Sequence, residues 1–172
     1  MPLTVEDGTV VAGADSYVAL ADANSYHTAR GNAAWAGTDT VKEAAIRRAT
    51  AYIDMAYRAR FPGAKREGRA QPLQWPREDA IDVRGEEIAD DEIPQEIKDA
   101  VCEAALREIA EAGSLMPDLD RGGQIKSIEA GSVGITYVDG APVKTSFQII
   151  DGILGDILMS MPNPYFTKAE RM

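Results

Sequence analysis

Two stretches of this chain carry apolar residues at helical spacing, and they limit the possible folds more than any other feature of the sequence. The first runs from residue 40 to 60 and the second from 94 to 113. Apolar residues three and four positions apart share one face of a helix, and that face is stabilised by burial. The two sets are Ile46, Ala49, Ile53, Ala56 and Tyr57, and then Ile97, Val101, Ala104, Ala105 and Ile109. A small helical bundle is therefore predicted.

Capping residues mark the ends of both helices. Thr40 and Glu43 have the spacing of a capping box, in which the hydroxyl and the carboxylate each bond a free backbone amide. Thr50 falls within the first apolar face, and its hydroxyl is expected to bond back to the carbonyl one turn earlier. Pro94 suits the first position of the second helix, and Gly113 suits its end. Each stretch is thus predicted to be one continuous helix.

Two shorter helices and two brief strands are also predicted. One helix is expected over about residues 21–30, where a glycine follows directly. The other is expected over 147–159, although each of its two glycines costs roughly 1 kcal/mol relative to alanine. Short strands are expected at 10–11 and 17–18, in an N-terminal arm or edge.

A β-hairpin is predicted over residues 124–138, because Val133, Ile135 and Tyr137 alternate with smaller residues. An isolated hairpin is marginal in water, so this one is expected to pack on the helices or on another subunit. The predicted fold class is mainly α: a small bundle of about four helices, with a long loop, a protruding β-hairpin and an extended C-terminal tail.

The chain is divided into one helical domain, residues 1–158, and a tail, residues 159–172. Prolines prevent the tail from continuing the last helix. Its aromatic residues lie outside any predicted element and are candidates for ordering against a partner. The residues concerned are Pro162, Pro164, Tyr165 and Phe166.

Residues 62–93 form the least regular part of the sequence. A stretch of this length without regular structure inside a compact domain is usually either a functional loop or a segment whose secondary structure has been wrongly assigned. Its charge changes sign along the chain, because Lys65, Arg66 and Arg69 come first and eight acidic residues follow between Glu78 and Glu92. Trp75 lies between two prolines, and its most economical role is an anchor that holds the loop to the helices. A partner-binding role for Trp75 is the alternative.

The sequence contains no recognisable catalytic constellation. One cysteine excludes an internal disulfide framework, and one histidine excludes a two-histidine metal motif. His27 is therefore expected to be a packing or surface residue and Cys102 a small buried apolar residue, and no catalytic, metal or cofactor-binding residue is assigned. A signal peptide and a membrane span are not expected, since the start is neither basic nor apolar and no apolar run approaches about 20 residues. The protein is predicted not to be an enzyme.

The formal charge of −10 argues against strong nonspecific binding to duplex DNA, which needs several lysines or arginines at the phosphates. A local basic patch remains compatible with this total. The best candidate extends from the first long helix into the loop, with tyrosines nearby. It comprises Arg47, Arg48, Arg58, Arg60, Lys65, Arg66 and Arg69, with Tyr52 and Tyr57.

Several motifs, taken together in their order and spacing, resemble the head–tail connector (adaptor, or head-completion) proteins of tailed bacteriophages. The opening residues resemble a subset of these proteins that is often labelled DnaT-like single-stranded-DNA-binding protein. The motifs are QPLQWPR at 71–77, IPQEIKDA at 93–100, IKS at 125–127, VGITY at 133–137, DG at 7–8, SYV at 16–18 and YHTARG at 26–31. The hairpin departs from the commonest form, because Ile128 separates Glu129 from the Lys-Ser pair.

The resemblance implies a structural virion protein at the capsid–tail junction, made in the host cytoplasm. About twelve copies are expected to form a ring under the portal protein and to dock the next tail component. Genomic DNA is expected to pass through an acidic lumen without specific binding, and no membrane partner is expected. The basic residues before Trp75 are hypothesised to meet the acidic stretch of a neighbouring subunit.

Contacts with a partner or with another subunit are assigned to residues of the loop, the hairpin and the tail. They are Lys65, Arg66, Arg69, Trp75, Arg77, Lys126, Val133, Ile135, Tyr137, Pro162, Pro164, Tyr165 and Phe166. The alternative function is single-stranded-DNA binding of the primosomal DnaT-like kind, which needs a basic groove with aromatic residues for stacking. A monomeric regulatory or adhesion module is a second alternative.

Overall fold

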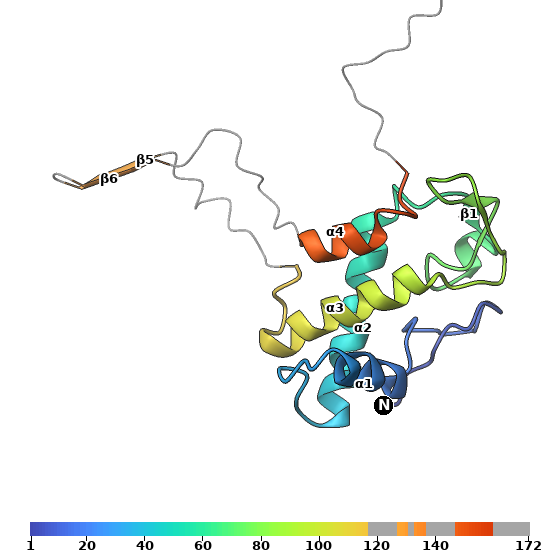
Figure 1. The fold of residues 1–172 in the computed structure, drawn as a ribbon, viewed down its shortest axis with the longest axis horizontal. Coiled ribbons are helices and arrows are strands. Elements are labelled where there is room, and N and C mark those ends of the chain that lie inside the picture. Colours follow the sequence, from blue (N-terminus) through green and yellow to red (C-terminus); the bar gives the residue numbers. More distant parts are fainter. Residues whose placement is uncertain (117–126, 131–132, 137–146, 160–172) are drawn as a thin grey trace, which may run out of the picture.

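Four α-helices make up most of the regular structure, as the sequence predicted. The computed structural model describes residues 1–116, 127–130, 133–136 and 147–159. The helices are α1 (Leu20–Ala29), α2 (Asp39–Tyr57), α3 (Gln95–Ala110) and α4 (Gln148–Leu154). Helix α3 packs against both α2 and α4, and α1 packs against α2 and α3 at the other end of the bundle (Figure 1). Within the described residues, no helix combines the length and the apolar character that crossing a bilayer requires.

The core between the helices is aliphatic and rich in alanine. Fully buried alanines lie on the facing sides of α2 and α3, where their small side chains let the two helices approach closely. Larger side chains from α2, α3 and α4 fill the remaining space, which confirms the apolar faces predicted from helical spacing. The central residues are Ala45, Ile46, Ala49, Ile53, Ile97, Ala100, Val101, Ala104, Ala105, Ile150 and Leu154.

The predicted capping details of α2 are wrong. Thr38 is the N-cap residue, and its carbonyl accepts hydrogen bonds from Val41 and Lys42. Thr40 therefore lies inside the first turn, where its hydroxyl cannot form the predicted capping box with Glu43. The hydroxyl of Thr50 is buried without a hydrogen-bond partner among the described residues, so it does not bond back along the helix.

Helix α4 is shorter than the predicted helix over 147–159. It ends at Leu154, and the chain then turns through hydrogen bonds from Gly155 to Gly152 and from Ile157 to Leu154. The two glycines account for this early end, because they weaken a helix and allow the tighter turn. Ile157 and Leu158 are nevertheless buried, so the turn is fixed to the body.

The N-terminal residues form turns in place of the two brief strands that were predicted. The buried carboxylate of Glu6 accepts hydrogen bonds from the backbone amides of Gly8, Val10 and Val11, at 2.9 to 3.0 Å. Since these donors are used locally, residues 10–11 cannot pair as a strand. The only bridge in this part of the described chain is a parallel one between Val5 and Ser16.

The predicted hairpin is present as β5 (Ser127–Ala130) and β6 (Val133–Thr136). The two strands are antiparallel, and Ser127 faces Thr136 in the register. The remainder of the predicted range 124–138 lies outside the described residues.

The long loop contains two small antiparallel pairs. β1 (Ala64–Lys65) pairs with β2 (Arg77–Glu78), and β3 (Ala80–Ile81) pairs with β4 (Glu87–Ile88). A 3-10 turn, η1 (Gly68–Ala70), separates β1 from β2.

Gly63 is required where β1 and β2 begin to pair. Its φ is +63°, and a Cβ added there would lie 2.1 Å from the carbonyl oxygen of Glu78. A larger residue would therefore push the two strands apart.

Candidate nucleic-acid interface

A buried hydrogen-bond network around Tyr17 and Asp54 fixes the long loop to the helices. The Tyr17 hydroxyl donates to Asp54 Oδ1 (2.7 Å) and accepts from the backbone amides of Gln74 (2.9 Å) and Trp75 (3.0 Å). The amide of Gln74 also donates to Asp54 Oδ2 (3.0 Å). These hydrogen bonds join the N-terminal segment, α2 and the long loop at one point. They fix the backbone of the loop at Gln74 and Trp75.

Burial raises the pKa of Asp54 to about 6, because the low-dielectric surroundings disfavour the charged carboxylate. Hydrogen bonds from Tyr17 and Gln74 oppose this shift without cancelling it. The folded state consequently holds the proton more tightly than the unfolded state does. Asp54 therefore contributes most to the free energy of unfolding below about pH 4, and this contribution is lost as the pH rises through about 6.

We compare the free energy of unfolding of the wild type with that of the variant Asp54→Asn. The wild-type value minus the variant value is expected to fall by about 2–3 kcal/mol as the pH rises from about 4 to 7. Asparagine does not titrate, so the difference isolates this carboxyl from other groups. Urea denaturation of both proteins at several pH values measures it. A difference that stays constant over this range would show that Asp54 titrates normally.

Trp75 and Arg77 lie on the inner side of the loop. Trp75 is fully buried, and its ring meets that of Phe61 edge to face with 5.8 Å between centroids. The guanidinium of Arg77 is also buried and donates to the carbonyl oxygens of Pro62 and Gly63. The anchor interpretation of Trp75 is confirmed. Both side chains are enclosed by their own chain and leave little surface for the partner contacts assigned to them.

Positive charge gathers in residues 58–69, which we call the basic segment. It follows α2 and runs through β1 to η1, and Glu67 is its one acidic residue. Among the described residues, none of its cations forms an ion pair. These cations are Arg58, Arg60, Lys65, Arg66 and Arg69.

Some side-chain cations of the basic segment donate hydrogen bonds to backbone carbonyl oxygens, and the others make no side-chain hydrogen bond to the described residues. Lys65 donates to the carbonyl of Gln71 (2.6 Å), and Arg60 donates to that of Met159 (3.4 Å). Arg66 reaches two backbone carbonyls in the same way. Arg58 and Arg69 are exposed, and their side chains make no hydrogen bond to the described part of the chain. A carbonyl oxygen does not neutralise a cation, so the full charge remains available to an anionic partner.

Ion pairs neutralise most cations elsewhere in the described chain. Five carboxylates take up five arginines on the helices and in the turn between β3 and β4. The pairs are Arg30–Asp99, Arg47–Asp15, Arg48–Glu108, Arg84–Asp156 and Arg107–Glu103. Arg47 and Arg48, which the sequence placed in the basic patch, are thus compensated.

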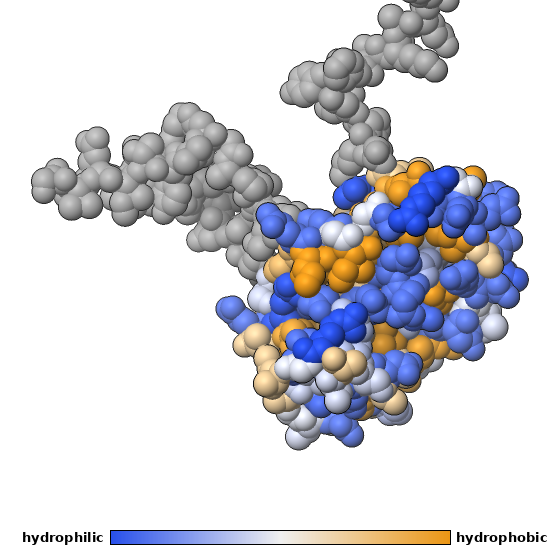
Figure 2. Space-filling view, viewed as in Figure 1, coloured by the Kyte–Doolittle hydropathy of each residue, from blue (hydrophilic) through white to orange (hydrophobic). Residues whose placement is uncertain are grey.

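The acidic residues after β2 border the basic segment. Eight carboxylates lie between Glu78 and Glu92, with Arg84 as the one cation among them. Pairing of β1 with β2 brings Glu78 opposite Ala64, at the edge of the basic segment. Figure 2 shows hydrophilic side chains along the upper right of the body, where Figure 1 places the loops around β1. The basic segment and the acidic stretch therefore adjoin, and Arg66 reaches the carbonyl of Asp90 across their border.

Aromatic rings are scarce on the described surface. Six of its eight aromatic side chains are buried, and Tyr26 and Phe147 are partly exposed. The ring of Tyr26 is covered by the guanidinium of Arg30, 3.4 Å from the ring centroid. Tyr52 and Tyr57, which lie near the predicted basic patch in the sequence, are both in the core. The basic segment therefore offers charge and guanidinium planes, but no aromatic platform of its own among the described residues.

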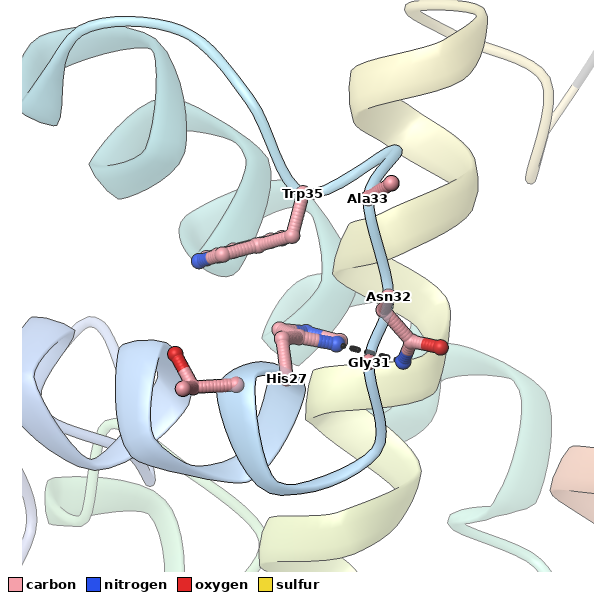
Figure 3. A pocket seen from close by; sticks show the side chains of 6 residues that line it. His27, Gly31, Asn32, Ala33 and Trp35 are labelled. Carbon is pink, nitrogen blue, oxygen red and sulfur yellow. Dashed lines mark hydrogen bonds between the residues drawn. The ribbon is translucent and has the colours of Figure 1, made fainter.

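A small pocket of about 300 Å³ lies beside His27, where the end of α1 meets the loop that follows it (Figure 3). The His27 ring stacks on Trp35 with 4.2 Å between centroids, and Asn32 Nδ2 lies 3.0 Å from His27 Nδ1. Burial lowers the pKa of His27. In the described part of the chain, no cluster of acidic residues, histidine and cysteine could hold a metal ion. His27 is a packing residue, as predicted, and so is the buried Cys102.

The remaining predicted contact residues are only partly described. Val133 and Ile135 belong to β6, whose backbone register is known. Lys126, Tyr137 and the four tail residues Pro162, Pro164, Tyr165 and Phe166 lie outside the described residues. The network of Tyr17 with Asp54 was not predicted, because neither residue has a sequence signal that identifies the other as its partner.

A family model described as "Putative DnaT-like ssDNA binding protein" matches residues 1–172. The chain belongs to this family. No match was found among curated proteins or among solved structures. The match to the DnaT-like family covers the whole chain, including the basic segment and the tail.

Membership of the DnaT-like family corrects the head–tail connector interpretation. The resemblance to phage connectors rested on several short motifs, whereas the family match extends over the full length. The predicted roles as a ring under the portal, as a portal partner and as a dock for a tail component are therefore wrong. The expectation that DNA passes through a lumen without being bound is wrong as well. The proposed contact between basic and acidic surfaces of neighbouring subunits depended on the ring and loses its basis. The alternative named from the sequence is the one that the match supports.

Proposed function

We propose that this protein binds single-stranded DNA through its phosphate backbone, with the basic segment as the contact surface. The observation that carries the proposal is the set of five cations in residues 58–69 that lack an ion pair in the described structure. Cations that neutralise phosphates release condensed counterions, and this release drives binding that is independent of sequence. The role is one of binding and requires no catalytic group.

The acidic stretch after β2 limits where the strand can lie. Phosphates are repelled by the eight carboxylates between Glu78 and Glu92, so a bound strand follows the basic segment and avoids the adjoining surface. The overall charge of −10 has the same effect over longer distances at low ionic strength. Binding is thus confined to one path, and affinity is expected to be moderate.

The contacts on this path favour a single strand of any sequence. The exposed guanidinium groups of Arg58 and Arg69 can pair with phosphates and can also stack on unpaired bases. The described basic segment presents no helix shaped for a major groove, which duplex readout commonly requires. Sequence preference is therefore expected to be weak.

We expect Arg58→Gln and Arg69→Gln each to weaken binding to oligothymidylate several-fold and to reduce the salt dependence. With five phosphate contacts the logarithmic slope of affinity against salt is about −3.5, and loss of one contact lowers its magnitude by about 0.7. Fluorescence anisotropy at a series of salt concentrations measures both values.

Lys98→Gln is the matched control for these two variants. Lys98 lies on α3, outside the basic segment, and forms no ion pair in the described structure, so the charge change is the same. Its affinity and slope should equal those of the wild type. If all three variants weaken binding equally, the net charge of the protein governs binding and the basic segment has no special part in it.

A further inference from the structure

The outer side of α4 presents apolar side chains to solvent. Ile150 and Leu154 are fully buried in the core, whereas Ile149 is exposed and Ile153 is only partly buried. Ile149 and Ile153 are four residues apart, so they lie on the same face of the helix. Figure 2 shows apolar surface where Figure 1 places α4. This second apolar stripe is separate from the one that packs into the core.

The hairpin of β3 and β4 continues the apolar surface beyond the end of α4. The backbone amide of Val83 donates to the carbonyl of Asp156 (2.9 Å), which places the tip of the hairpin against the turn that follows α4. Ile81 and Val83 are two residues apart, and both are exposed. Exposed apolar side chains that gather within a polar rim mark interaction sites. We call Ile81, Val83, Ile149 and Ile153 the α4 surface.

The rim of the α4 surface is acidic. Helix α4 carries Asp151 and no cation. The hairpin carries three carboxylates and the single cation Arg84; the carboxylates are those of Asp82, Glu86 and Glu87. Arg84 pairs with Asp156 (3.3 Å), so this pair adds no net charge. The carboxylates of the hairpin and of Asp151 therefore decide the charge of the rim.

Two further cations lie near the two ends of α4 and are engaged locally. Arg107, which lies over the ring of Phe147, pairs with Glu103 (3.4 Å). Arg60 donates to the carbonyl of Met159 (3.4 Å), beyond the last turn. Between them, the α4 surface combines exposed apolar side chains with net negative charge.

Charge decides between the possible occupants of the α4 surface. DNA is repelled by the carboxylates of the rim. A second copy related by a twofold axis would place the same acidic rim against itself. A helix with an apolar stripe flanked by lysines or arginines matches both properties, because its apolar side chains can pack along α4 while its cations meet the rim.

We propose that the α4 surface is the docking site for a basic amphipathic helix of a partner protein. The apolar stripe of that helix covers Val83, Ile149 and Ile153, and its cations lie near Glu86 and Glu87. The docking site is built from other residues than the basic segment. The inference therefore does not rest on DNA binding, and its failure would leave the proposed function unchanged.

The probe is a labelled helical peptide of about 18 residues, with leucines at positions i, i+3, i+4 and i+7 and lysines on both sides of that stripe. We expect the full-length wild type to bind this peptide in fluorescence anisotropy. The same peptide with glutamate in place of each lysine should bind at least about tenfold more weakly. The double variant Val83→Asn and Ile149→Asn should bind the lysine peptide about tenfold more weakly or worse, because apolar burial is lost at both positions.

Val41→Asn with Met55→Asn is the matched control. Val41 and Met55 lie on α2 and are 47% and 54% exposed, close to the 58% of Val83 and the 46% of Ile149. Exposed substitutions should leave the fold intact, which circular dichroism verifies. The control should bind the lysine peptide as tightly as the wild type does. An equal loss in the two double variants would overturn the assignment to the α4 surface.

Three other results would also overturn the inference. Equal binding of the two peptides would show that the acidic rim selects no partner. No binding of the lysine peptide up to about 1 mM would show that the surface is not open to a partner helix. Analytical ultracentrifugation is expected to give the same mass for the wild type and for the Val83 and Ile149 variant. A dimer that the double variant abolishes would make a second copy the occupant.

Discussion

Replacing Trp75 by alanine is expected to destabilise the protein by about 3–5 kcal/mol, the range found when a large buried aromatic side chain is removed. Trp75 is fully buried, packs edge to face on Phe61, and its backbone amide donates to the Tyr17 hydroxyl. Alanine leaves a cavity at the point where the loop meets the helices. Because a small domain is stable by only about 5–15 kcal/mol, this loss is a large part of the total.

Urea denaturation followed by circular dichroism measures the effect of Trp75→Ala. Met55→Ala is the control, since Met55 is a large apolar residue of α2 with 54% of its surface exposed. The control should stay within about 0.5 kcal/mol of the wild type. Trp75→Phe should fall between the two, because it keeps a ring and removes an indole N–H that has no partner among the described residues. Equal stability of the alanine variant and the control would show that Trp75 is not the anchor.

Reversing two charges of the basic segment should have the largest effect on DNA binding. In the double variant Arg58→Glu and Arg69→Glu, two attractive contacts become repulsive, and like charges placed together cost several kcal/mol. We expect affinity for oligothymidylate at low salt to fall by about 100-fold or more. Both side chains are exposed and lack hydrogen bonds to the described residues, so the fold should be unaffected.

The control for charge reversal is Arg84→Glu with Lys98→Glu, which changes the net charge by the same amount. Arg84 lies within the acidic stretch and Lys98 lies on α3. This variant should lose only the small long-range part of the attraction. A comparable loss in both double variants would mean that binding responds to total charge, and the assignment to residues 58–69 would be withdrawn.

The helical part of the fold could be predicted from the sequence because it depends on periodicity. The apolar faces of α2 and α3 repeat over several turns, so a misplaced residue does not change the result. Details that depend on one residue were predicted less well. Helix α2 begins two residues earlier than the capping box suggested, because Thr38 and Thr40 look alike in sequence. The N-terminal strands failed because the Glu6 carboxylate takes the amides that a strand would need.

The candidate site was partly visible in the sequence. The cluster of cations near residue 60 is a compositional feature, but its chemistry depends on which cations are already paired. Arg48 pairs with Glu108, sixty residues further on, and no local pattern reveals this. The network of Tyr17 with Asp54 joins two elements that are distant in sequence for the same reason. Contacts between distant residues require the fold.

The connector interpretation failed for a different physical reason. Helical bundles with few exposed aromatic residues serve many functions, and a fold does not identify a partner. The charge of −10 is a sum over the whole chain, whereas the basic segment holds five cations and one carboxylate. A total charge describes the average field around a protein, whereas binding depends on the local arrangement.

Amide hydrogen exchange of the wild type, with and without oligothymidylate, tests the central claim most directly. The method reports both whether a strand binds and which part of the backbone it covers. The account predicts slower exchange in residues 58–69 on binding, with little change in the acidic stretch between Glu78 and Glu92. Unchanged exchange in residues 58–69 at saturating oligothymidylate, or slowing confined to other parts of the chain, would contradict it.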